Sequence, residues 1–174
     1  PTEPTQMYLS PSPIHVTVGS TFTIAVMVAN VDHLFAWQIM LCFDNAVLKC
    51  TEDMISLPAN HVFAGKPIVP VRPRIWKGTE RTYITYGCTL LGEETPKFSG
   101  TGTLCQINFT GLAAGTSSLN FLGKDTFLLG KDTFPHEITF TASDGEATVT
   151  YIPGDLNRDG KVNIRDIATA ATAF

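Results

Sequence analysis

This sequence of 174 residues contains few charged side chains and no long apolar run. Asp, Glu, Lys and Arg together make up 16% of it, which is low for a cytosolic enzyme and usual for a secreted β-rich domain. No apolar stretch is long enough for a membrane helix, so we expect no membrane span. The net charge of −4 argues against a nucleic-acid partner, which would require a basic face.

Cysteine is also scarce, and the four cysteines contain no C-x-x-C pair. This spacing favours disulfides over a zinc or redox site and indicates an oxidising compartment. The first residues, PTEPTQ, are unlike a signal peptide and are typical of a processed or trimmed chain. The N-glycosylation sequon Asn108-Phe109-Thr110 makes Asn108 a candidate glycosylation site. We therefore expect an extracellular or cell-surface protein.

Patterns that indicate catalysis are missing. The four histidines lie far apart in sequence, without an i, i+4 pair or a nucleophile elbow: His15, His33, His61 and His136. Glu93 and Glu94 fall in a predicted loop, where a solvated turn explains them as well as a glycosidase pair would. Trp76, Tyr83 and Tyr86 are expected in the core, the alternative being a sugar-stacking face. We expect the protein not to be an enzyme.

What the sequence does contain is a series of short segments with alternating apolar residues. In Thr21–Asn30 and Phe35–Phe43 every second residue is apolar, the period of a strand with one buried face. Further strands are predicted at Ala46–Thr51, Arg81–Leu91, Thr103–Leu112, Ser117–Phe121, Glu137–Ala142 and Glu146–Tyr151. The proline-rich segment Glu52–Trp76 is typical of a loop or an edge strand. Residues 1–152 are therefore predicted to form an all-β, antiparallel β-sandwich.

The chain ends in a second unit, residues 153–174, whose oxygen-bearing residues have the spacing of a calcium loop. Positions 1, 3, 5, 7, 9 and 12 of a twelve-residue loop are Asp155, Asn157, Asp159, Lys161, Asn163 and Asp166. Calcium takes six to eight oxygens, and a loop supplies them from alternate side chains, a carbonyl at position 7 and a closing carboxylate. Gly160 falls at position 6, where the loop turns sharply. We expect Ca²⁺ at these residues, with Lys161 ligating through its carbonyl.

A short amphipathic helix is predicted directly after this loop. Asn163 can cap it, with Asp166 completing a capping box. One apolar stripe runs along it, formed by Ile164, Ile167, Ala168, Ala171 and Phe174. Such a short helix is marginal alone in water. The stripe is therefore expected to pack on the chain's own sandwich or on a neighbouring molecule.

Two parts of the sequence resemble known families. Val18–Val31, Ala36–Cys50 and Gly102–Phe121 are similar to cohesins, and Phe43-Asp44-Asn45-Ala46-Val47-Leu48 matches the corner that follows an aromatic strand in that family. This resemblance implies a jelly-roll sandwich, from which the insert Met54–Arg81 departs. Asp155–Phe174 resembles one calcium-binding repeat of a dockerin, the module that binds cohesins. Dockerins carry two repeats, and their contact positions 10 and 11, often small and hydroxylated, are here Ile164 and Arg165.

The cohesin-like topology also implies two disulfides. It places the strand of Cys50 beside that of Cys105, and the strand of Cys42 beside that of Cys88. We therefore expect the pairs Cys50–Cys105 and Cys42–Cys88, the alternative being four free buried thiols.

These observations together predict a non-catalytic extracellular calcium-binding module for protein–protein docking or self-assembly, as in cell adhesion, a surface scaffold or a filament. The partner would be a protein or another copy of the chain, in contact with Ile164, Arg165, Ile167, Ala168, Ala171 and Phe174. The segment Pro1–Pro13 could also add a strand to a neighbour's sheet. The alternative is a carbohydrate-binding module of a secreted glycan-active protein, possible on the same fold.

Overall fold

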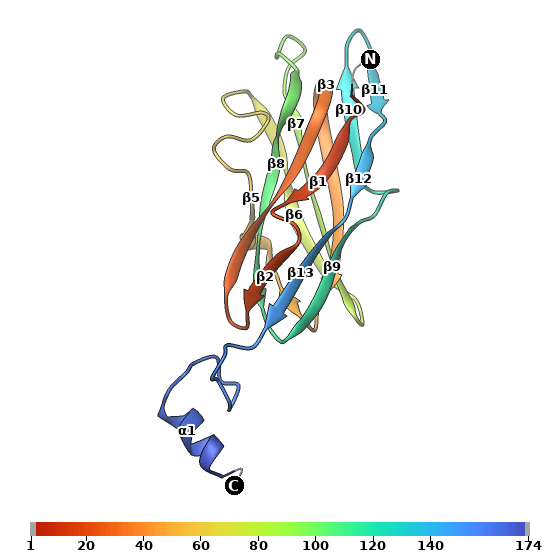
Figure 1. The fold of residues 1–174 in the computed structure, drawn as a ribbon. Helices are drawn as coiled ribbons and strands as arrows, with labels where there is room; N and C mark the ends of the chain where they lie inside the picture. The colour runs from red at the N-terminus through yellow and green to blue at the C-terminus, as the bar shows by residue number, and fades with distance from the viewer. Residues whose placement is uncertain (1–2, 173–174) are drawn as a thin grey trace.

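The longest strand, β3 (Thr21–Asp44), runs through both sheets of a β-sandwich (Figure 1). The structure is a computed structural model that describes residues 3–172. The other strands are β1 (Gln6–Ser10), β2 (Ile14–Thr17), β4 (Leu48–Lys49), β5 (Ile55–Ser56), β6 (Ile68–Lys77), β7 (Arg81–Leu90), β8 (Phe98–Gly111), β9 (Gly115–Phe121), β10 (Phe127–Lys131), β11 (Pro135–Ile138), β12 (Thr141–Ser143) and β13 (Gly145–Thr150). A 3-10 turn, η1 (Glu52–Met54), precedes β5, and the helix α1 (Ile164–Ala171) lies after the last strand.

Strand β3 joins the two sheets because it bends in the middle, so that each half belongs to a different sheet. Its first half pairs with β1 and β8, and its second half pairs with β7, β9 and β10. Asn30 and His33 have φ angles of 54° and 49°, in the left-handed region, and the register with β8 shifts on both sides of Val31. These irregularities bend the strand. The two strands predicted at Thr21–Asn30 and Phe35–Phe43 are therefore one.

The remaining strands extend the sheets on either side of β3. Strands β7 and β6 follow on one side of its second half, and β10–β11 and β9–β13–β2 on the other. Its first half lies between β8, which also pairs β4 and β5, and β1, which also pairs β12. The pairs β1–β12 and β2–β13 are parallel, in an otherwise antiparallel fold. The predicted sandwich is confirmed.

The core is formed by the alternating apolar residues that the sequence predicts. Val26 and Val28 in the first half of β3, and Ile39 and Leu41 in the second, are completely buried. The ring of Phe109 on β8 joins the halves, with its centroid 5.8 Å from Phe22 and 5.2 Å from Phe43. Trp37 meets Tyr86 edge to face at 5.6 Å. The core lies between the sheets, and both halves of β3 contribute to it.

The cohesin-like corner after β3 also adopts its expected form. Asp44 ends the strand, and its Oδ1 accepts a hydrogen bond of 2.8 Å from the backbone N–H of Ala46. Val47 and Leu48 then turn inward, with 7% and 1% of their surfaces exposed. The aspartate thus closes a turn whose apolar residues return directly to the core.

Three of the observed strands were not predicted. One of them, β1, contradicts the role suggested for the N-terminal segment. Strands β1, β2 and β10 are short, and apolar and polar residues do not alternate clearly in the sequences of β1 (QMYLS) and β10 (FLLGK). Strand β1 pairs with β3 and β12 of its own chain, and Met7 and Leu9 are buried there. The suggestion that Pro1–Pro13 adds a strand to a neighbour is therefore wrong for the part described. Within residues 3–172, no helix is long and apolar enough to cross a membrane.

The two predicted disulfides are absent, and all four cysteines are free and buried. Cys42 lies opposite Tyr83, five residues along β7 from Cys88, a separation of about 17 Å at strand spacing. Lys49, next to Cys50, lies opposite Thr110, five residues along β8 from Cys105. A disulfide requires Cα atoms within about 7 Å. The neighbouring strands were predicted correctly, since β3 lies beside β7 and β4 beside β8, but their register separates the thiols.

Thiol chemistry provides a test of this correction. Burial raises the pKa of Cys50 to about 12 and that of Cys88 to about 11, so both should be unreactive in the folded chain. We expect a thiol reagent to label none of the cysteines in the native protein and all four in denaturant without reductant. Reductant should leave the melting temperature unchanged, whereas the loss of a disulfide would remove about 4 kcal/mol. Fewer than four thiols in denaturant would contradict the structure.

Candidate functional site

The loop between β13 and α1 is closed by its first acidic residue, Asp155. This carboxylate is buried, with 6% of the residue exposed. Its Oδ1 accepts the backbone N–H of Asp159 at 3.1 Å, and its Oδ2 accepts that of Gly160 at 2.8 Å. Gly160 has a φ of +84°, a conformation that glycine adopts without strain. Asp155 thus brings the first, fifth and sixth residues of the loop together.

The last acidic residue, Asp166, connects the loop to the helix. Its Oδ1 accepts the N–H groups of Leu156 and Asn157 at 2.8 and 3.2 Å, and its Oδ2 accepts that of Asn163 at 2.7 Å. These backbone hydrogen bonds, that of Asn163 first, hold the pKa of Asp166 below its ordinary value. Asp166 is 3% exposed. One carboxylate therefore connects both ends of the loop.

Helix α1 begins at the predicted capping box. The side chain of Asn163 accepts the backbone N–H of Arg165 at 2.9 Å, while Asp166 accepts that of Asn163. Both halves of the box are present. The helix is only eight residues long, so it depends on the loop and the capping box for much of its stability.

The loop carries the oxygen-bearing side chains on which the calcium prediction rests. Asn157 Oδ1 and Asp159 Oδ1 accept the N–H groups two residues ahead, which fixes both side chains against the loop. The predicted set comprises three carboxylates, two amides and the carbonyl of Lys161, all oxygen ligands. In the described residues, however, no three Asp, Glu, His or Cys side chains form a group that could hold an ion. Calcium binding by this loop therefore stays a prediction.

The apolar stripe of α1 faces solvent. Ile164 is 78% exposed and Ile167 66%, and Ala168 and Ala171 are also exposed. Figure 1 shows the helix beyond the end of β13, away from the sandwich, and it has no extensive contact with any described strand. In the loop before the helix, the Arg158 guanidinium lies 4.6 Å from the ring of Tyr151, just after β13. Packing of the stripe on its own sandwich is therefore not observed.

Two more predicted site residues remain untested or lie outside the structure. Phe174, the last residue of the stripe, lies outside the described residues. Asn108 lies in the middle of β8, half-buried, where its Oδ1 accepts the hydroxyl of Thr23 at 2.6 Å. Glycosylation at Asn108 stays a prediction.

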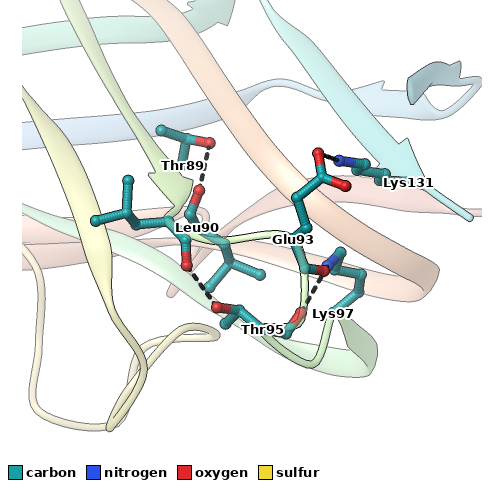
Figure 2. Close-up of polar contacts among 7 residues, drawn as sticks. Thr89, Leu90, Glu93, Thr95, Lys97 and Lys131 are labelled. Atoms are coloured by element: carbon teal, nitrogen blue, oxygen red, sulfur yellow. Dashed lines mark hydrogen bonds and ion pairs between the residues drawn. The ribbon is translucent and has the colours of Figure 1, made fainter. Parts of the chain in front are cut away.

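The acidic pair considered for catalysis occupies the loop between β7 and β8. Figure 2 shows Glu93 Oε1 bound to the Lys131 ammonium group at 2.9 Å, while Lys97 donates to the carbonyls of Glu93 and Thr95. The hydrogen bond and charge of Lys131 lower the pKa of Glu93. A general acid in a glycosidase needs a raised pKa, so Glu93 is unsuited to that role. Lys131 thus joins β10 to this loop, and Lys97 closes the loop on itself.

The histidines are divided among β2, β3, the segment before β6, and β11. His33 Nδ1 lies 3.1 Å from Asp32 Oδ1 and 3.2 Å from Asp132 Oδ1. Ser99 donates its hydroxyl to Asp32 at 2.6 Å, and it is not bonded to the imidazole. This geometry does not provide the base-activated serine of a hydrolase.

The aromatic residues expected in the core are not all buried there. Tyr86 is buried against Trp37, as predicted. Trp76 is 43% exposed and stacks on Tyr83, so its assignment to the core was wrong. Strand β6 is an edge strand, and the alternation of β6 places Trp76 on its outer face. The proline-rich sequence around it indicated an edge, which is the signal that could have placed Trp76 on the surface.

The fold defined by these sheets is a two-sheet sandwich, and solved structures identify its type as cohesin-like. A non-cellulosomal cohesin from Archaeoglobus fulgidus aligns with 85% of this chain and 92% of its own, at 13% identity and a TM-score of 0.60. A Clostridium acetobutylicum cohesin aligns with 88% and 94%, at 15% identity and a TM-score of 0.61. A type I cohesin–dockerin complex from Clostridium thermocellum aligns at 12% identity and a TM-score of 0.62, covering 85% and 100%. These likenesses establish the fold.

No protein-family model matches the sequence, and no curated protein matches it either. Function must therefore be argued from the residues of this chain.

The capping box predicts how α1 responds to mutation. In calcium-free buffer, Asn163→Ala should remove the acceptor for the Arg165 N–H and destabilise the helix by about 1 kcal/mol. Backbone chemical shifts of residues 164–171 should then move toward coil values. Thr169→Ala, on the exposed side of the same helix, is the control and should preserve or increase helicity. Equal shifts in both variants would argue against the cap.

Proposed function

We propose that this chain is an extracellular, non-catalytic docking module whose C-terminal loop binds Ca²⁺ and presents α1 to a protein partner. The observation that carries the proposal is the exposure of Ile164 and Ile167 on a helix whose base is an ordered loop of oxygen donors. Leu156 and Val162 are also exposed, at 54% and 58%. Contiguous exposed apolar side chains indicate an interaction surface.

Calcium would stabilise this surface through the loop. Asp155 and Asp166 already accept five backbone N–H groups, and an ion would add charge-neutralising bonds to their remaining lone pairs. The carboxylates repel one another until a cation lies among them, so binding and ordering of the loop are coupled. In this proposal Asn157, Asp159, Asn163 and the Lys161 carbonyl complete the coordination.

The partner we propose is a cohesin-type sandwich, in another protein or in a second copy of this chain. The support is that this chain carries a cohesin-like fold, and that one similar solved structure is described as a cohesin–dockerin complex. Arg165 lies beside Ile164 on the exposed surface and would add a charged contact. The proposal of an extracellular setting rests on the amino-acid composition. A calcium-binding loop is consistent with such a setting.

Calcium binding can be measured by calorimetry and amide hydrogen exchange. We expect one calcium site. At a calcium concentration about 100 times the dissociation constant, binding should stabilise the folded loop and α1 against opening by about 2.7 kcal/mol, which slows amide exchange roughly hundredfold. Asp155→Ala should lower the calcium affinity at least about tenfold, because loss of a residue that only supports a metal ligand already costs that much. Glu94→Gln removes an exposed carboxylate far from the loop and should bind normally. Absence of heat and unchanged exchange in millimolar calcium would refute the site.

Docking can be tested by size-exclusion chromatography with light scattering. The chain is run alone and mixed with the cohesin of Clostridium acetobutylicum, each with calcium and with chelator. We expect a complex with the cohesin or a self-associated species in calcium only, and its loss in the Ile164→Asp/Ile167→Asp variant because charges replace the apolar contact. Leu91→Asp changes an exposed leucine on the sandwich and is the control. A monomer under every condition would contradict the proposed partner class.

A further inference from the structure

The outer face of β6 carries an aromatic pair that the docking helix does not use. Trp76 on β6 lies opposite Tyr83 on β7, with ring centroids 5.7 Å apart and planes 12° from parallel. Trp76 is 43% exposed although it is a large apolar side chain. The register places the pair at the edge of the sheet, because within residues 3–172 β6 pairs only with β7. One face of a flat aromatic stack is thus available to solvent.

The pair is held in place before any ligand arrives. The turn from β6 to β7 is closed by a 2.8 Å hydrogen bond from the N–H of Gly78 to the carbonyl of Arg81. A Cβ at Gly78 would lie 3.3 Å from the ring of Tyr83, so the turn packs closely against that ring. Tyr83 in turn is stacked on Trp76. A rigid aromatic surface loses little conformational entropy on binding.

A shallow hollow lies along β6 at the residues that directly precede Trp76. It has a volume of about 360 Å³ and is lined by Glu52, Arg72, Pro73, Arg74 and Ile75. An Arg72 guanidinium nitrogen lies 3.5 Å from Glu52 Oε2, and the side chain of Arg72 is 87% exposed while that of Glu52 is 44% exposed. The hollow therefore combines fork-shaped donors and a carboxylate acceptor with the neighbouring indole.

We propose that the Trp76–Tyr83 pair and this hollow bind a polysaccharide of β-linked pyranose rings with equatorial hydroxyls. Such rings expose C–H groups on both faces, which stack on an indole, and hydroxyls at the rim, which require donors and acceptors. Trp76 holds one ring, and Arg72, Arg74 and Glu52 bind the hydroxyls of the next. The two arginines of the hollow, Arg72 and Arg74, outnumber Glu52, so a carboxylate-bearing sugar binds at least as well as a neutral one.

A sugar fits this edge better than an added protein strand does. Pro70 and Pro73 lie in β6, and the register with β7 shifts between Val71 and Arg74. Proline has no N–H to donate, and a bulge interrupts the regular row of backbone groups that strand addition requires. Val69 and Val71, 47% and 50% exposed, extend the apolar surface along the strand. The side chains, and not the backbone edge, are available for binding.

Binding can be measured by calorimetry and by affinity electrophoresis with two probes, cellohexaose and a glucuronic-acid-substituted xylo-oligosaccharide. We expect Trp76→Ala to weaken binding about tenfold or more, as at a central aromatic contact. Trp76→Phe should keep most of the affinity because it keeps an aromatic face. Phe134→Ala, at an exposed aromatic on the sandwich far along the chain, is the matched control and should bind as the original does.

The outcomes separate this proposal from the docking function. Equal binding of both probes supports stacking, and tighter binding of the acidic probe supports stacking with a contribution from the arginines. No binding of either probe at millimolar concentration overturns the proposal, as does equal loss in Trp76→Ala and Phe134→Ala. It is also overturned if Trp76→Ala weakens only a complex with the cohesin. Calcium removal should leave glycan binding unchanged, so the two functions can fail independently.

Discussion

The pairing of β3 with five other strands is the constraint on which the sandwich depends. Its two halves bury alternate apolar residues on the inner faces of different sheets, so that one strand contributes to both walls of the core. A shift of one residue along β3 would turn Val26, Ile39 and their neighbours outward. The bend at Asn30–His33 allows both halves to keep their correct face at the same time.

The C-terminal loop is organised by a different interaction, in which carboxylates accept backbone N–H groups. Asp155 and Asp166 hold the loop and the start of the helix without contacts to the sandwich core. A unit built in this way depends on local polar bonds and has little apolar burial of its own. This difference explains how α1 can lie at the end of a stable sandwich and still leave its apolar side chains exposed.

The proposed surfaces also differ in the physics of recognition. The helix offers branched aliphatic side chains that require an apolar, desolvated partner surface, as protein interfaces provide. The Trp76–Tyr83 pair offers a flat aromatic face beside charged groups, which suits a ring with a C–H face and a polar rim. The two surfaces belong to separate elements, and one is supported by a sheet edge while the other is supported by a loop. They can therefore act without excluding each other.

The sequence by itself determined the sandwich, the Asp44 corner, the calcium-type spacing and the capping box. Each of these follows from short-range rules: a period of two in a strand, an aspartate at a turn, and fixed offsets within one loop. Only the tertiary structure decided the free cysteines, the continuity of β3, the place of β1 and the exposure of Trp76. These depend on the register between distant strands and on which strand lies at an edge, and neither is encoded in the spacing of neighbouring residues.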